Sequence, residues 1–112
     1  MNLNNHDRSI ESTVIASLLL NESYLYEEAF IIDEVYFVLP FHKMLVKRIR
    51  EGIEKGESLS LLNIKLDAYI RDVKFEYEKE WINIIASMPL SMKIAHQYYE
   101  DIKVKHKIRK IR

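Results

Sequence analysis

Hydrophobic residues recur every three or four positions along most of the chain, which is the spacing of one face of an α-helix. The first such stretch predicts a helix that begins with Ser9 as its N-cap and ends near Asn21. A second helix is predicted from Tyr24 to Ile32, followed by a short link over 33–37. The buried face of the first helix is predicted to consist of Ile10, Val14, Ile15, Leu18 and Leu19.

Proline, glycine and serine divide the middle of the chain into two more predicted helices. Pro40 is suited to the first turn of a third helix, and Gly56 is suited to follow its last turn. Ser60 is expected to cap a fourth. The apolar stripes of these two helices are predicted to be Phe41, Leu45, Ile49 and Ile53 in the third, and Leu61, Ile64, Leu66 and Ile70 in the fourth.

The last third of the chain predicts two further helices. A charged stretch, residues 71–80, covers a turn and the start of a fifth helix, in which Trp81, Ile84 and Ile85 face inward and which Pro89 ends. Ser91 is expected to cap a last helix that passes through Tyr98 and Ile102. We therefore expect an all-α fold, a compact bundle of about six helices forming one domain over 1–112. Residues 1–8 would be a flexible start, and 91–112 the last helix with a basic end, which the family resemblance given below implies is the start of a helical hairpin.

The composition excludes several kinds of site and shows that charge is unevenly distributed along the chain. The chain has 112 residues and no cysteine, which excludes disulfides, thiolate nucleophiles and cysteine-ligated zinc. Its apolar runs are too short to cross a bilayer and its start lacks a signal-peptide pattern, so a cytoplasmic protein is expected. The net charge is zero, yet 1–102 carry 17 acidic and 11 basic residues, a net charge of −6. The basic remainder offers five candidate phosphate contacts: Lys103, Lys105, Lys107, Arg109 and Lys110.

Motifs for catalysis or for cofactor binding are absent from the sequence. Gly52 and Gly56 are isolated and no phosphate-binding loop exists, so phosphate-loop nucleotide hydrolysis by this chain is excluded. His96 and Glu100 lie at i, i+4 and could share a metal, but two ligands define no site, and a solvated pair is the preferred interpretation. We expect no catalytic residue, no metal and no cofactor.

His42 is the one residue that resembles part of an active site, because it lies in the apolar run "YFVLPFHKMLV". It could be a catalytic base, a contact for a partner, or a polar group pinned inside the core. The sequence indicates no nucleophile or orienting residue for catalysis, so the pinning role is preferred. Phe37, Phe41 and Leu45 would enclose the ring, and Pro40 and Trp81 are counted as structural residues with it.

The order of three sequence blocks resembles the N-terminal domain of the DnaB family of bacterial replicative helicases. The first is "SIESTVIASLLLNESYL" (9–25), similar to the family's opening "IE…VLG…L". The second, "DEVYFVLPFHKMLVKRIREGIEKGESLSLLNI" (33–64), places His42 on the family's histidine and Ser60 on its helix-capping aspartate. The third, "SMPLSMKIAHQYYEDIKVKHKIRKI" (87–111), matches at Pro89 and Tyr99, with about two extra residues between them.

Some positions depart from the family pattern. Ala16 or Ser17 stands where the family usually has glycine, and residues 71–80 replace a longer segment. The chain would end inside the family's helical hairpin, and the linker and ATPase motor would lie elsewhere. The chain is therefore expected to be either a fragment or a stand-alone relative.

The resemblance implies a non-catalytic role in DNA replication. Such domains form a collar on the helicase ring, as dimers within a hexamer. They bind the C-terminal domain of primase and, in some systems, the helicase loader. The collar surrounds DNA, with weak or indirect contact. An apolar stripe at the chain end would carry such contacts here, formed by Tyr98, Tyr99, Ile102, Val104, Ile108 and Ile111. No membrane partner is expected.

Three alternatives stay open. The C-terminal helicase-binding domain of primase has a similar helical fold. A small nucleic-acid-binding protein could use the basic end, although Val104, Ile108 and Ile111 make that segment amphipathic, as a packing helix requires. An enzyme with an unrecognised helical active site is the third.

Overall fold

The computed structural model describes residues 5–20, 31–86 and 92–110. Within these ranges the chain forms five α-helices and two short 3-10 turns, and no strand. The elements are α1 (Asn5–Leu20), η3 (Glu34–Tyr36), α2 (Pro40–Glu54), α3 (Leu59–Asp72), η4 (Phe75–Tyr77), α4 (Glu78–Ala86) and α5 (Met92–Lys110). The predicted all-α class is confirmed, whereas the expected number of about six helices is slightly too high for the part described.

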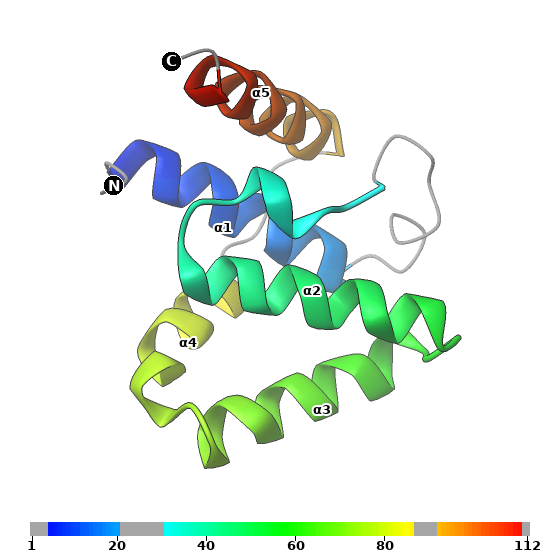
Figure 1. Ribbon diagram of the computed structural model, residues 1–112. Coiled ribbons are helices and arrows are strands. Elements are labelled where there is room, and N and C mark those ends of the chain that lie inside the picture. Colours follow the sequence, from blue (N-terminus) through cyan, green and yellow to red (C-terminus); the bar gives the residue numbers. More distant parts are fainter. Residues whose placement is uncertain (1–4, 21–30, 87–91, 111–112) are drawn as a thin grey trace.

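The helices are stacked with α1 at the centre. α5 lies on one side of α1 and α2 on the other, α3 covers the far side of α2, and α4 closes one end beside α1 and α3 (Figure 1). This central position explains why the whole predicted apolar face of α1 is buried, together with Ala16 and Ser17. Ser17 satisfies its hydroxyl by donating to the carbonyl of Thr13 at 2.7 Å. Small side chains at these two positions therefore fill the place where glycine was expected.

Several predicted boundaries are corrected. α1 is described from Asn5, so Ser9 is an exposed residue inside the helix rather than its N-cap, and residues 5–8 are helical. Ile31 and Ile32 are not helical, so no helix extends to Ile32. The rest of the predicted 24–32 helix, and the predicted end signals Asn21, Pro89 and Ser91, lie outside the described residues.

α2 has the boundaries that proline and glycine predicted. Pro40 occupies its first turn, and Gly56 follows it with φ +74°, a left-handed conformation that glycine adopts without strain. The amide of Gly56 donates to the carbonyl of Ile53, and that of Glu57 to the carbonyl of Gly52, both at 2.9 Å. These are the two bonds of a Schellman motif, which satisfies carbonyls at the end of a helix.

The start of α3 is capped by Ser58 and not by Ser60. Ser58 Oγ accepts from the amide of Leu61 at 3.2 Å, which places Ser60 inside the first turn. The buried face is rotated accordingly, because Leu62, Leu66 and Ile70 are buried while Leu61 and Ile64 are exposed. In α4, Trp81 and Ile84 are buried as predicted, but Ile85 is exposed.

Candidate functional site

His42 lies in the core and is paired with Glu11 of α1. Its side chain is 2% exposed and that of Glu11 4%, and Nδ1–H of His42 donates to Oε1 of Glu11 at 2.7 Å. The second carboxylate oxygen, Oε2, accepts from the amide of Val38 at 3.0 Å. Nε2 of His42 lies 3.5 Å from the hydroxyl of Ser12. The pair therefore joins α1 to the first turn of α2 and to the segment before it.

This arrangement leaves little scope for catalysis. A general base must reach a substrate, and both members of this pair are closed off from solvent. Buried ionisable groups are retained when their polar atoms have partners, and here Nδ1 of the ring and both carboxylate oxygens have one, while Nε2 has only the Ser12 hydroxyl at the outer limit of hydrogen-bond distance. The geometry is that of a polar pin between two helices.

Glu11 was missed in the sequence. It stands on the first predicted helix at i−4 and i−7 from Ile15 and Leu18, so it shares their buried face. A single acid on an apolar helix face needs a buried donor, and a single histidine in an apolar run needs an acceptor. Predicting that Glu11 pairs with His42 would have required knowing that their two helices lie side by side.

The residues that the sequence analysis grouped with His42 have different environments. Phe37 and Trp81 are core residues, whereas Pro40 is exposed at the start of α2. The indole Nε1–H of Trp81 donates to Oδ1 of Asp67 at 3.0 Å, which ties α4 to α3. This bond, together with the guanidinium of Arg71, lowers the pKa of the Asp67 carboxyl below its ordinary value.

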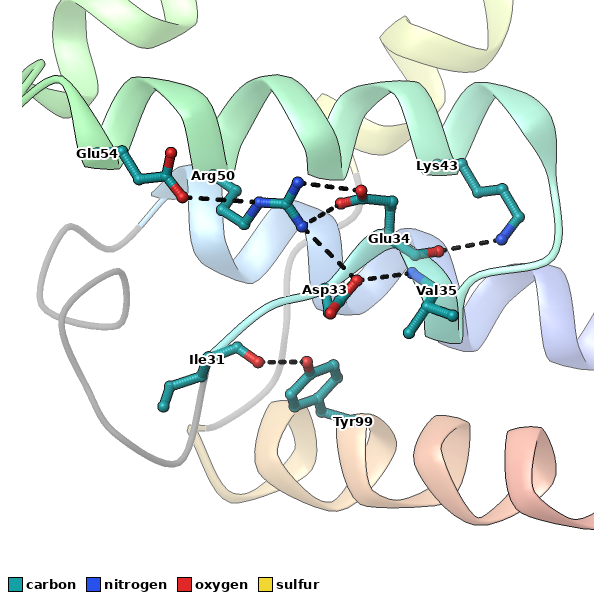
Figure 2. A network of polar contacts seen from close by, with 8 residues as sticks. All are labelled: Ile31, Asp33, Glu34, Val35, Lys43, Arg50, Glu54 and Tyr99. Atoms are coloured by element: carbon teal, nitrogen blue, oxygen red, sulfur yellow. Dashed lines mark hydrogen bonds and ion pairs between the residues drawn. The ribbon is translucent and has the colours of Figure 1, made fainter.

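A polar network holds the segment around η3 against α2 and α5 (Figure 2). Arg50 on α2 contacts both carboxylate oxygens of Glu34, with N–O distances of 2.5 and 3.0 Å, and lies 3.6 Å from Asp33. The hydrogen bond with Glu34 raises the pKa of Arg50 above its ordinary value. On the other side, the hydroxyl of Tyr99 donates to the carbonyl of Ile31 at 2.7 Å. This segment therefore connects two helices that are far apart in sequence.

The predicted interaction stripe on the last helix is divided between two faces of α5. Tyr99 and Ile102 are core residues, so they are not surface contacts. Burial raises the pKa of Tyr99 above its ordinary value. Tyr98 is partly buried against the core, Val104 and Ile108 are exposed, and Ile111 lies outside the described residues. Because Ala95, Tyr99 and Ile102 are buried positions of α5, positions 104 and 108 lie on the opposite, exposed side of this helix.

The five candidate phosphate contacts also have different environments. Lys103 forms an ion pair with Glu100 at 2.8 Å, and Lys105 forms one with Asp7 of α1. Lys107 and Lys110 are exposed, and Arg109 is half-buried. At least two of the five cations are thus engaged within the domain, which reduces the charge available to a nucleic acid.

A groove runs between α3 and α4, with a volume of about 420 Å³. Nothing in the sequence analysis anticipated it, because Ile64 and Ile85 were expected in the core. The hydrogen bond from Trp81 to Asp67 crosses between the two helices that form it. Its lining consists of Asn63, Ile64, Asp67, Ala68, Trp81 and Ile85.

A second hollow, of about 170 Å³, lies where α2 and α3 approach each other. Gly52 permits this approach, because a Cβ there would stand 2.8 Å from a methyl group of Leu62. The guanidinium of Arg48 stacks over the ring of Tyr69 at 3.7 Å, and Lys65 pairs with Glu57 at 2.9 Å. Most of the charged side chains around this hollow therefore already have a partner within the domain.

A family model described as the DnaB-like helicase N terminal domain matches residues 3–104. The chain belongs to this family. No curated protein and no solved structure matches it with significance.

The DnaB-like N-terminal domain is a non-catalytic part of a replicative helicase. Two residues of the family's motifs, His42 and the glutamate of "IE", form the buried pair. Tyr99, from the third block, is a core residue bonded to the chain before η3. In this DnaB-like domain these three motif residues therefore occupy packing positions, whereas Ser60 is exposed.

The described ranges contain no group of three His, Asp or Glu side chains that could hold a metal ion. Glu100 forms an ion pair with Lys103. None of the helices described is both long enough and apolar enough to cross a bilayer.

Proposed function

We propose that this chain is an assembly and protein-interaction domain of a cytoplasmic replicative DNA helicase. In this role it contributes to the N-terminal collar together with other helicase subunits, and it docks the primase C-terminal domain or the helicase loader during DNA replication. The observation that carries the proposal is the match of residues 3–104 to the DnaB-like helicase N-terminal domain.

The surface of the domain supports binding rather than chemistry. The only ionic pair that is buried on both sides in the described residues, Glu11 with His42, is sealed in the core. Large aliphatic side chains are instead exposed on α5, at Val104 and Ile108, and along the α3–α4 groove. Apolar side chains grouped on neighbouring positions are typical of protein contacts. The outer face of α5, formed by Val104, Lys107 and Ile108, is the proposed contact with another subunit.

The docking role is tested by titrating the purified chain with the helicase-binding domain of primase from the same source, using calorimetry. We expect saturable binding at one ratio, retained in a variant with His42→Ala at a temperature where that variant is folded. Absence of any binding heat for primase and for the loader, with a folded chain, would refute the docking role.

The alternative that the chain is the primase side of this pair is disfavoured by the family match. Binding of the chain to a purified helicase N-terminal collar, with no binding to primase, would reverse that preference. Nucleic-acid binding is the remaining alternative, and the ion pairs of Lys103 and Lys105 weigh against it as the main role.

A further inference from the structure

The α3–α4 groove is an apolar surface without a cover among the described residues. Ile64 on α3 is 67% exposed and Ile85 on α4 is 43% exposed, on opposite walls. Leu61 and Ile82 extend these walls, since they lie at i−3 from Ile64 and from Ile85 and are exposed as well. The volume of the groove, about 420 Å³, lies within the range of about 300–1,000 Å³ that is usual for sites that take up ligand-sized groups. Side chains of another molecule can therefore enter it.

One end of the groove carries an excess of negative charge. Asp67, in the groove wall, and Glu78, at the start of α4, share the guanidinium of Arg71. Nε of Arg71 lies 3.0 Å from Oδ1 of Asp67, and Nη1 lies 3.0 Å from Oε1 of Glu78. The side chains of Arg71, Asp67 and Glu78 are 45%, 42% and 41% exposed, and together they carry a net charge of −1. Because a carboxylate can accept several hydrogen bonds, a further cation would be stabilised at this end.

The charge around the groove differs from the charge around the outer face of α5. The stretch 67–80, next to the groove, carries five acidic and three basic residues, a net charge of −2. The stretch 103–110, which contains the proposed contact with another subunit, carries five basic residues and no acidic one. Residues 71–80 also replace a longer segment of the family pattern, so the acidic end of the groove belongs to a part of the chain that departs from that pattern.

We propose that the α3–α4 groove docks an amphipathic helix of a partner protein other than a helicase subunit. Large apolar side chains of that helix meet Ile64 and Ile85, and a lysine or arginine lies over Asp67 and Glu78. The inference rests on the proposed docking role, because it names the surface that docks and the chemistry of the segment that binds there. Complementary charge fixes the position of such a helix along the groove.

The positions of the apolar and the acidic side chains set the spacing of the docked helix. Asp67 and Arg71 follow Ile64 by three and seven residues on α3, which corresponds to about 5 and 10 Å along the helix axis. A second helix lying along the groove also rises about 1.5 Å per residue, so its cation should stand one to two turns from its apolar anchors. Amphipathic helices bind apolar grooves through anchors spaced i, i+3, i+4 and i+7.

The test uses a designed helical peptide as the probe and the full chain as the receptor. The peptide has about eighteen residues, enough for a helix in water, with leucine at three positions spaced i, i+4 and i+7. One arginine stands four residues beyond the leucines at each end, so a cation reaches the acidic end in either orientation, and the other positions are alanine and glutamine. A second peptide has glutamate in place of both arginines. Calorimetry should show that the arginine peptide binds about three- to tenfold more tightly, and high salt should remove most of this difference by screening.

Three substitutions in the chain separate the apolar from the charged contribution. Ile64→Gln should weaken the binding of both peptides about tenfold or more, as expected for a central contact residue. The matched control is Ile108→Gln, the same change at a 56% exposed isoleucine of α5, which should leave binding unchanged. Glu78→Lys changes the net charge of the three side chains from −1 to +1, so the glutamate peptide should then bind more tightly than the arginine peptide. None of the three substituted side chains is buried, so each variant should keep a melting temperature close to that of the wild type.

Several results would overturn the proposal. These are the absence of binding of both peptides by the wild-type chain, equal weakening by Ile64→Gln and Ile108→Gln, or a preference for the arginine peptide that survives Glu78→Lys. A wild-type mass in sedimentation velocity that rises with concentration, and that no longer rises in Ile64→Gln, would also overturn it, because the groove would then hold a second copy of the chain.

These outcomes are distinguishable from failure of the proposed function. A chain that binds the peptides as described but binds neither primase nor loader would overturn only the docking role. Binding of primase that Ile64→Gln leaves unchanged, together with no binding of either peptide, would overturn only the assignment of docking to the groove.

Discussion

Replacing His42 with alanine tests the reasoning about the buried pair most directly. The substitution removes the ring that donates to Glu11 at 2.7 Å and leaves a carboxylate that is 4% exposed with only the amide of Val38 as partner. Breaking a buried pair by removing one member costs about 3–5 kcal/mol, because the other member stays buried. A domain of this size has a total stability of about 5–15 kcal/mol, so the variant should remain measurable.

The assay is urea unfolding followed by helical circular dichroism, for the wild type, both single variants and the double variant. Glu11→Ala should cost a similar amount, since it also removes the acceptor for Val38. The double variant should cost less than the sum of the two by about 1–3 kcal/mol, because each single change already breaks the shared interaction.

Ser12→Ala is the matched control for this cycle. Its hydroxyl lies 3.5 Å from Nε2 of His42, at the outer limit of a hydrogen bond, so its loss should cost less than about 0.5 kcal/mol. The reasoning fails if His42→Ala costs less than about 1 kcal/mol, or if the two single costs simply add.

Three further predictions concern other parts of the domain. The pKa of Asp67 is lowered in the folded state, so its negative charge stabilises the fold above the unfolded pKa of about 3.9. The loss of unfolding free energy caused by Asp67→Asn should therefore be full near pH 7 and shrink as acid protonates Asp67 in the wild type. A loss that grows in acid would contradict this. Gly56→Ala should cost about 1 kcal/mol in urea unfolding, because only the backbone at φ +74° is strained and nothing lies within 4 Å of the new Cβ; no loss would refute it. Binding of single-stranded DNA, measured by fluorescence anisotropy, should give a slope of log binding constant against log salt concentration no steeper than about −2, since two of the five basic side chains are in ion pairs. A slope near −3.5 would show that all five bind phosphate.

Local patterns predicted some features of this domain closely. The limits of α2 follow from Pro40 and Gly56, whose backbone preferences act within one or two residues. The five apolar residues predicted to face the core from α1 are all buried, because this helix lies at the centre of the bundle. Glu11, Ala16 and Ser17 are buried as well without having been predicted, and Leu20 at the end of the helix is 48% exposed. At the start of α3 the pattern was wrong, because Ser60 was predicted as the cap where Ser58 is, and Leu61 and Ile64 were predicted to be buried where Leu62 is.

The sequence by itself determined the all-α class, the family and the burial expected of His42, because helical periodicity and motif order are properties of the chain read in one dimension. The tertiary structure alone decided that Glu11, 31 residues away, is the partner of His42, and that Tyr99 contacts Ile31 across 68 residues. It also decided which aliphatic residues remain outside. Ile64 and Ile85 are exposed because α3 and α4 present other residues to the core, and a hydrophobic residue on a helix becomes a core residue only where another element covers it.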